Sequence, residues 1–322
     1  MAVNTVETQA PAEEKAKLMI TPSPHFRDDI NTRKIMLTVA TALLPALVMS
    51  IFYFGIRALL LTAVCVVSCV AFEYLWERCT KRTITAGDLS AAVTGLLLAY
   101  NLPPTIPFWM AVLGSLFAII VVKQFFGGLG CNIVNPALAA RAMMLTSWPV
   151  PMTTWTLDGV SGATPLALIK EGSLDKLPSL TNLFVGNIGG CIGETSALAL
   201  LIGFALLLYK DIIKWQVPVI YIAVVAALCT VFGRPVGPVY EILAGGLFLG
   251  AIFMATDYTT TPITLRGQMI FAVGCGLLTS LIRTWGGYPE GVSYSILIMN
   301  LTVPLIDRVT KPRIFGEVKK HG

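Results

Sequence analysis

Two apolar stretches follow each other near the start of the sequence, IMLTVATALLPALVMSIFYFG at 35–55 and ALLLTAVCVVSCVAFEYLWE at 58–77. Each has about the 20 residues that a helix needs to cross a lipid bilayer. The whole chain of 322 residues is 55% hydrophobic and only 13% charged, and its mean hydropathy is +0.76. The sequence therefore predicts an all-α polytopic membrane protein. It excludes a soluble enzyme, a nucleic-acid binder and a disordered scaffold.

Apolar runs of this kind predict about ten transmembrane helices, some of them short or broken. The run 88–102 is short for a span, and Asn135-Pro136 predicts a broken or partly unwound fifth helix. The ten runs are 35–55, 58–77, 88–102, 106–123, 133–150, 193–210, 215–233, 240–257, 267–285 and 291–308. The expected domains are an N-terminal tail (1–34), a first transmembrane repeat (35–150), an external loop (151–192), a second transmembrane repeat (193–308) and a C-terminal tail (309–322).

The placement of Lys and Arg predicts the orientation of these spans. With the N-terminus in the cytoplasm, 17 of these residues fall in cytoplasmic segments and 5 in external ones. Cytoplasmic segments of membrane proteins carry such an excess. We therefore expect both termini in the cytoplasm and the 151–192 loop outside. Residues 1–24 contain no long apolar stretch, so no cleavable signal peptide is expected.

The two halves of the chain share a pattern that predicts an internal repeat. Asn101 and Asp257 follow the third and eighth runs at an offset of 156 residues, and Gly127-Gly128 and Gly286-Gly287 follow the fourth and ninth runs at 159. Each repeat holds five helices, an odd number, so the second copy must be inverted. Sites in such proteins lie near the interface between the repeats.

A loop motif after the fifth run presents one hydroxyl among small residues. It reads Asp158-Gly159-Val160-Ser161-Gly162-Ala163-Thr164-Pro165. The glycines permit tight turns, and Pro165 holds Thr164 extended. A large group can approach Thr164 closely in such a turn. The alternative interpretation is an ordinary external turn.

This motif resembles the flavinylation motif of membrane subunits in the Rnf and Na⁺-pumping NADH:quinone oxidoreductase complexes. The resemblance runs from about residue 20 to residue 310, and the short N-terminal tail favours the RnfD branch of the family. Further segments that carry it are Ser23-Pro24-His25, Gly127-Gly128-Leu129-Gly130-Cys131-Asn132, Asn135-Pro136-Ala137 and Ala255-Thr256-Asp257.

The resemblance implies that Thr164 carries FMN through a phosphoester bond, which a flavin transferase makes from FAD. Ser161, Gly162 and Ala163 complete the motif. Asp158 is either a contact for the transferase or a turn-forming residue. The resemblance also implies a second, non-covalent flavin, riboflavin. We expect riboflavin in an inner cleft formed by 127–136 and 257–262.

The same resemblance implies a subunit of an ion-translocating ferredoxin:NAD⁺ oxidoreductase in the bacterial cytoplasmic membrane. Its partners would be the other Rnf membrane and peripheral subunits, including a second flavin-bearing subunit, and Na⁺ or H⁺ would be the transported ion. The sequence has no four-cysteine iron–sulfur pattern and no GxGxxG after a strand. Ferredoxin and NADH chemistry therefore belongs on other subunits, and this chain has no complete catalytic site.

Arg141 lies inside the fifth span, where a charge needs a partner or water. It is either a donor to a flavin or one half of an ion pair with Glu194, Glu241 or Glu73. Asn101 and Gly286 are expected beside the flavinylation loop in an outer cleft, and Asn135 in the inner one.

Four carboxylates lie near span ends: Asp257, Asp307, Glu73 and Glu241. Each either helps to bind Na⁺ or carry protons, or is an interfacial carboxylate. Asp257 is the first choice for an ion, because Thr259, Thr260 and Thr261 offer hydroxyl oxygens next to it.

Two other functions fit the sequence. One is the homologous subunit of the quinone oxidoreductase, which a reducible quinone in the purified complex would indicate. The other is an inverted-repeat transporter or channel for a small solute, which would carry no flavin.

Overall fold

The computed structural model describes residues 30–157, 160–194 and 196–311. Residues Met1–Asn31 and Thr32–Gly322 form separate units, and the account below concerns the second. Most of the predicted N-terminal tail, Asp158 of the motif, and the C-terminal tail from residue 312 lie outside the described residues.

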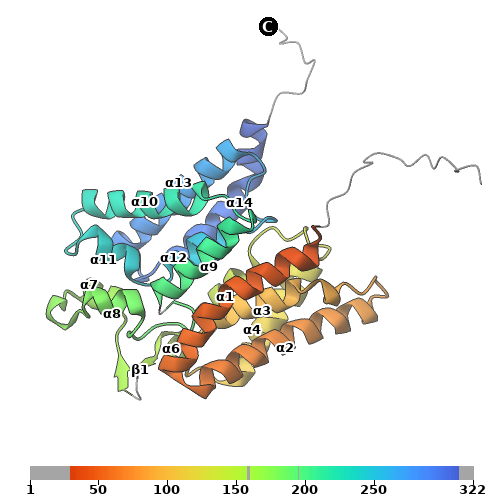
Figure 1. The fold of residues 1–322 in the computed structure, drawn as a ribbon, viewed down its shortest axis with the longest axis horizontal. Coiled ribbons are helices and arrows are strands. Elements are labelled where there is room, and N and C mark those ends of the chain that lie inside the picture. The colour runs from red at the N-terminus through yellow and green to blue at the C-terminus, as the bar shows by residue number, and fades with distance from the viewer. Residues whose placement is uncertain (1–29, 158–159, 195, 312–322) are drawn as a thin grey trace, which may run out of the picture. The chain divides into compact units, whose positions relative to one another are not determined.

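The first half of this unit consists of five helical segments (Figure 1). Leu102-Pro103 ends the third, and positive φ angles of 126° at Gly127 and 98° at Gly128 end the fourth, because these angles suit glycine. The segments are α1 (Thr32–Phe54), α2 (Ile56–Cys79), the 3₁₀ turn η1 (Ala86–Asp88) with α3 (Ser90–Tyr100), α4 (Phe108–Leu116) continued by the π-helix η2 (Phe117–Gln124), and α5 (Pro136–Ser147).

The connection between the halves has structure of its own, where the sequence predicted only a loop. Strands β1 and β2 pair antiparallel, with Trp155 opposite Gly162. The elements are α6 (Pro149–Thr153), β1 (Trp155–Leu157), β2 (Val160–Gly162), α7 (Pro165–Glu171), η3 (Leu174–Lys176) and α8 (Leu180–Val185).

The second half again has five helical segments. The third of them is broken at Ala244–Gly246 and continues as a π-helix, and such breaks in membrane helices are tolerated where protein surrounds them. The segments are α9 (Ala197–Tyr209), α10 (Gln216–Val231), α11 (Pro238–Leu243) with α12 (Leu247–Leu249) and η4 (Gly250–Met254), α13 (Leu265–Trp285), and α14 (Val292–Thr310).

The prediction of an all-α polytopic membrane protein is confirmed. Every predicted span contains a helical segment. Within the described residues four helices, α1, α2, α13 and α14, are long and apolar enough to cross a bilayer. Shorter helices such as α3 lie inside the protein, where nine of its residues are buried.

The expected break at Asn135-Pro136 is wrong in its effect. Asn135 accepts hydrogen bonds from the backbone N–H groups of Ala137 and Leu138 at 3.1 and 3.3 Å. It therefore caps α5, and Pro136 takes the first helical position, where its missing N–H costs nothing. The pair begins a continuous helix and does not interrupt one. The eighth predicted span is the broken one.

The helix packing relates the two halves. Helix α1 packs against α9, α2 against α3 and α4, α10 against α13, and α5 against α14; α1 and α9 lie side by side in Figure 1. Gly203 of α9 sits against α1 so closely that a Cβ there would lie 2.2 Å from the carbonyl oxygen of Ala42. Small residues at helix crossings allow such close approach in membranes.

A reciprocal pair of contacts between the fifth helices of the halves fits the predicted repeat. Arg141 of α5 donates to Asn101 of its own half and to Glu290, directly before α14 begins. Asn300 of α14 donates to the carbonyl oxygen of Thr260 in its own half and accepts from the N–H of Asn135 at the start of α5, both at 3.1 Å. Each fifth helix thus reaches the N-terminus of the other.

Candidate functional site

A cavity of about 330 Å³ opens beside the flavinylation loop, and we call it the Arg141 pocket. Its size falls in the range of about 300–1,000 Å³ typical of small-molecule sites. Its walls come from α5, the 151–192 connection and the segment before α14. The residues discussed below that line it are Arg141, Met152, Trp155, Gly162, Ala163, Thr164, Glu194, Gly245, Tyr288, Glu290 and Tyr294.

Thr164 lies at the wall of the Arg141 pocket, half-buried. Its hydroxyl oxygen accepts from the N–H of Ala167 at 3.2 Å and so caps α7. Pro165 follows as the first residue of the helix. The preceding Gly162 and Ala163 are small and exposed, so they leave the hydroxyl accessible. Ser161 lies on β2 opposite Thr156.

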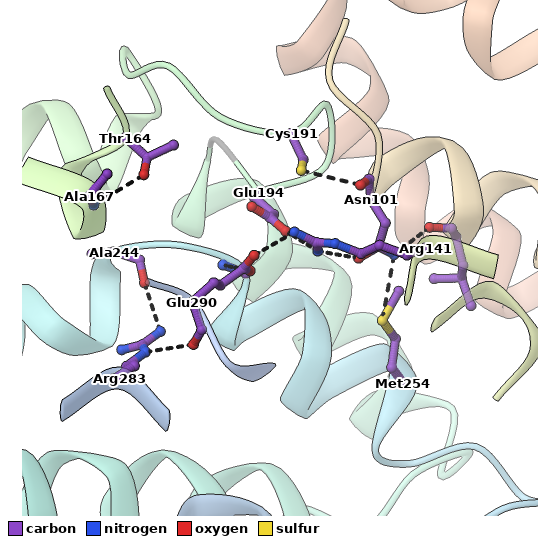
Figure 2. A network of polar contacts seen from close by, with 12 residues as sticks. Asn101, Arg141, Thr164, Ala167, Cys191, Glu194, Ala244, Met254, Arg283 and Glu290 are labelled. Carbon is purple, nitrogen blue, oxygen red and sulfur yellow. Dashed lines mark hydrogen bonds and ion pairs between the residues drawn. The ribbon is translucent and has the colours of Figure 1, made fainter. Parts of the chain in front are cut away.

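Arg141 is 6% exposed and its guanidinium is held by three side chains (Figure 2). One terminal nitrogen donates to Asn101 Oδ1 at 2.8 Å and to Glu194 Oε1 at 2.7 Å, and the other donates to Glu290 Oε2 at 2.5 Å. Of the three carboxylates that the sequence offered as partners, only Glu194 contacts it. The position of the guanidinium is thereby fixed at the pocket wall.

Glu194 and Glu290 approach each other at Gly246. A Cβ at Gly246 would lie 2.5 Å from Oε1 of Glu290 and 2.6 Å from Oε1 of Glu194, so only glycine fits between these oxygens. Burial and the Glu290 carboxylate raise the pKa of Glu194, in the connection before α9, to about 8, although Arg141 opposes this shift. Burial alone would favour neutral Glu290, but Arg141 outweighs it and lowers the pKa of Glu290.

A second ionic cluster lies beside the first and uses Glu241, one of the predicted Arg141 partners. Arg283, 1% exposed, donates to Glu241 at 3.3 Å and to the carbonyl oxygen of Glu290 at 3.1 Å. Arg234 donates to Glu241 at 2.7 Å. This cluster has two cations for one carboxylate, whereas the Arg141 cluster has one cation for two. The two clusters balance each other's charge, as buried charges require.

Asn101 and Gly286, expected in the outer cleft, act from behind the pocket wall. Asn101 is buried and donates to the carbonyl oxygen of Leu97 while it accepts from Arg141. The carbonyl oxygen of Gly286 accepts from Lys170 of α7, and so does that of Gly287. Lys170 thereby ties the helix that Thr164 caps to the turn after α13.

Two tyrosines form an aromatic part of the pocket wall. The rings of Tyr288 and Tyr294 stack with centroids 5.3 Å apart and an interplanar angle of 23°. Offset-stacked rings are the preferred geometry for such pairs. A planar aromatic ligand would meet a flat, polarisable surface here.

The other predicted cleft is a smaller cavity of about 100 Å³ that Asp257, Asn135, Asn132 and Lys123 line. Asn132 donates to Thr259 across it at 3.0 Å. Asp257 accepts from the hydroxyls of Thr259 and Thr260 at 2.9 and 3.2 Å. The structure thus brings together the segments that the sequence assigned to the inner cleft, and the threonine run does surround Asp257.

The remaining predicted ion residues are paired elsewhere. Glu73 forms an ion pair with Lys123 at 2.6 Å, and Asp307 accepts from the N–H of Ile263 at 3.2 Å. Within the described residues, no group of three or more His, Cys, Asp or Glu side chains is placed to hold a metal ion.

Sequence reasoning missed Glu290, Tyr288 and Tyr294. Two signals pointed to them: the segment before the last span was expected beside the flavinylation loop, and Glu290 is a charge at a span boundary. Neither signal assigned Glu290 to Arg141, because that pairing depends on how the two halves pack.

The fold and this pocket define a multi-pass membrane protein that presents one threonine hydroxyl to a charged, partly aromatic cavity. The NQR2, RnfD, RnfE family description matches residues 19–316. The chain belongs to this family, and the resemblance stated from the sequence is confirmed.

Three relatives show how close this relationship is, and each bears the letter D among the subunits of its complex. The relative from the Na(+)-translocating ferredoxin:NAD(+) oxidoreductase complex of Acetobacterium woodii is 52% identical, covering 94% of this chain and 96% of its own length. The one from the Proton-translocating ferredoxin:NAD(+) oxidoreductase complex of Clostridium ljungdahlii is 47% identical, covering 92% and 96%. The one from the Ion-translocating oxidoreductase complex of Stutzerimonas stutzeri is 40% identical, covering 88% and 92%.

Proposed function

We propose that this chain is the flavin-carrying membrane subunit of an Rnf-type ferredoxin:NAD⁺ oxidoreductase complex, with FMN bound to Thr164 through a phosphoester. The observation that carries the proposal is that Thr164 and Arg141 line the same cavity. A group attached to the threonine oxygen can therefore extend to a fixed guanidinium without any rearrangement of helices.

The residues of the pocket fit FMN by their chemistry. Thr164 supplies the ester oxygen. Arg141 offers N–H donors and a positive charge to a ring carbonyl or a phosphate, and Arg is well suited to both. The stacked Tyr288 and Tyr294 offer an aromatic surface. When bound, FMN would supply one-electron transfer, while the protein supplies its position and electrostatics.

The role in the complex follows from the relatives and the membrane fold. We propose that the chain relays electrons between other Rnf subunits, including a second flavin-bearing subunit, and that a flavin transferase modifies it. We place it in the bacterial cytoplasmic membrane with both termini in the cytoplasm and the 151–192 loop on the opposite side. Relatives named for Na⁺ and for proton translocation are similarly close, so the proposal covers either ion.

Replacing Thr164 by Val tests the flavin attachment. The chain is expressed with a matching flavin transferase, denatured and separated by gel electrophoresis. We expect yellow-green fluorescence on the wild-type chain and none on Thr164→Val, because valine has no oxygen for the ester. The matched control is Thr153→Val, which removes another hydroxyl from the pocket lining. Equal fluorescence on Thr164→Val and wild type would contradict the proposal.

A second flavin, riboflavin, belongs to the proposal as a non-covalent cofactor. The Asp257 cavity of about 100 Å³ is smaller than the range of about 300 Å³ and above in which small ligands usually bind. Riboflavin does not fit there with the side chains as they lie, so we assign it no residues. Release of riboflavin from the native chain by acid, with FMN retained, would support its presence.

We further propose that Asp257 takes part in ion coupling. Asp257→Asn keeps the size and the threonine contacts but removes the charge. In the complex reconstituted into vesicles, we expect loss of ion transport while FMN stays attached. Asp211→Asn is the control, because Asp211 is exposed with φ 51°, an angle that asparagine tolerates. Undiminished transport by Asp257→Asn would rule out this role.

A further inference from the structure

The Arg141 pocket contains one more carboxylate than its cation can balance. Arg141 contacts Glu194 at 2.7 Å and Glu290 at 2.5 Å. The nearest further cation, Arg283, is engaged by Glu241 and by backbone oxygens of Ala244 and Glu290. Two ionised carboxylates that face each other and share one cation repel, and such sites bind a proton.

The contacts show which carboxylate is the better anion. Glu290 accepts from Arg141 with one oxygen and from the N–H of Gly246, at 2.9 Å, with the other. Glu194 accepts from Arg141 with one oxygen and otherwise faces Glu290 and the thiol of Cys191. Glu290 is therefore stabilised as a carboxylate, and Glu194 is the residue that gains most from a proton.

We propose that Glu194 and Glu290 form a proton-binding pair, and that proton binding to Glu194 balances negative charge added to the group on Thr164. This inference rests on the proposed attachment of FMN, since both glutamates line the cavity that Thr164 borders.

The charges balance in a single step. One electron from a neighbouring electron carrier of the complex adds one negative charge to the flavin. One proton from water binds to a carboxylate oxygen of Glu194, and the oxygen–hydrogen bond replaces the charge of that carboxylate. The net charge of the pocket is then unchanged, which a cavity of low polarity favours.

Other ionisable groups around the pair are accounted for. Arg141 and Arg283 act on it as fixed cations. Cys191 is buried behind it and donates to the backbone oxygen of Asn101 at 3.3 Å. Tyr288 and Tyr294 line the same cavity but ionise near pH 10 when unperturbed. Glu194 is thus the group expected to change charge in the neutral range.

The first experiment needs no flavin. Full-length Thr164→Val in lipid is titrated with pH while infrared absorption of protonated carboxyl groups is recorded. We expect a carboxyl band that disappears near pH 8, far above the value of about 4.3 for a free glutamate. The band should be absent when Glu194→Gln is added, and it should titrate at lower pH with Glu290→Gln, because Glu194 then faces Arg141 alone. Asp175→Asn, an exposed site on the same connection, should leave it unchanged.

The second experiment uses the FMN-loaded chain and follows its midpoint potential against pH. In the wild type we expect the potential to fall through the range where Glu194 ionises, because an ionised pair disfavours added negative charge. In Glu194→Gln this part of the slope should vanish, so its potential exceeds that of the wild type at alkaline pH and converges with it at acidic pH. Asp175→Asn should follow the wild type.

The outcomes separate the two proposals. A missing carboxyl band in the flavin-free chain, or equal slopes in wild type and Glu194→Gln, overturns the proton-binding pair even if FMN is attached. A chain without FMN that still shows the band and its loss in Glu194→Gln retains the pair but refutes its coupling to FMN, together with the proposed function. If Glu194→Gln does not accumulate, the shift in Glu290→Gln decides.

Discussion

Arg141→Met is expected to lose most of its folded population in detergent, since it leaves Glu194 and Glu290 buried without their cation. Removing one partner of a buried ion pair costs about 3–5 kcal/mol, a large part of the stability of a typical domain. Thermal unfolding of the purified chain measures the effect. Arg266→Met, an exposed position on α13, is the control.

Restoring the charge balance should reverse this loss. In the triple variant with Glu194→Gln and Glu290→Gln, no uncompensated charge remains, and replacing a whole buried ion cluster is often neutral. We therefore expect the triple variant to unfold at a higher temperature than Arg141→Met alone. A single Arg141→Met variant as stable as the wild type would contradict the described contacts.

Gly203→Leu is expected to separate the first helices of the two halves. The new Cβ would lie 2.2 Å from the carbonyl oxygen of Ala42 and 2.9 Å from the ring of Phe253, and the backbone of α1 cannot yield without moving the helix. Overpacking of a core costs about 1–3 kcal/mol and occasionally more. We expect the upper end of that range, because a backbone atom is the obstacle.

The matched control for this prediction lies on the same helix. Ala205 is exposed on α9, so Ala205→Leu adds the same side chain at a position that faces outward. The thermal midpoint of Ala205→Leu should stay near that of the wild type, while Gly203→Leu falls by several degrees. Similar midpoints for the two variants would show that α1 and α9 do not pack as described.

The spans could be predicted from the sequence because hydropathy alone decides what enters a bilayer. Each of the ten apolar runs contains a helical segment, including the short α3. Where helices start and break could not be predicted as well. Asn135-Pro136 has the composition of a break, but the Asn135 side chain makes it a helix start. The actual break at Ala244–Gly246 lies in a run that reads as apolar.

The candidate site was only partly predictable for a similar reason. The motif identified Thr164, and hydropathy identified Arg141 as a charge inside a span. The distant partner Glu290 contacts Arg141 across 149 positions of sequence. No local pattern encodes such a contact, which arises only when α5 packs against α14. The hairpin of β1 and β2 was missed because three-residue strands leave no periodic pattern.

The attachment residue itself is the central claim, and mass analysis of peptides from the purified chain tests it most directly. The chain is taken from a host with an active flavin transferase, cleaved, and its peptides are sequenced by fragmentation. The account predicts one FMN, less one water, on the peptide that contains Thr164, and fragments that place it on that residue. FMN on another hydroxyl, such as Ser161, or its absence from every peptide, would contradict the account.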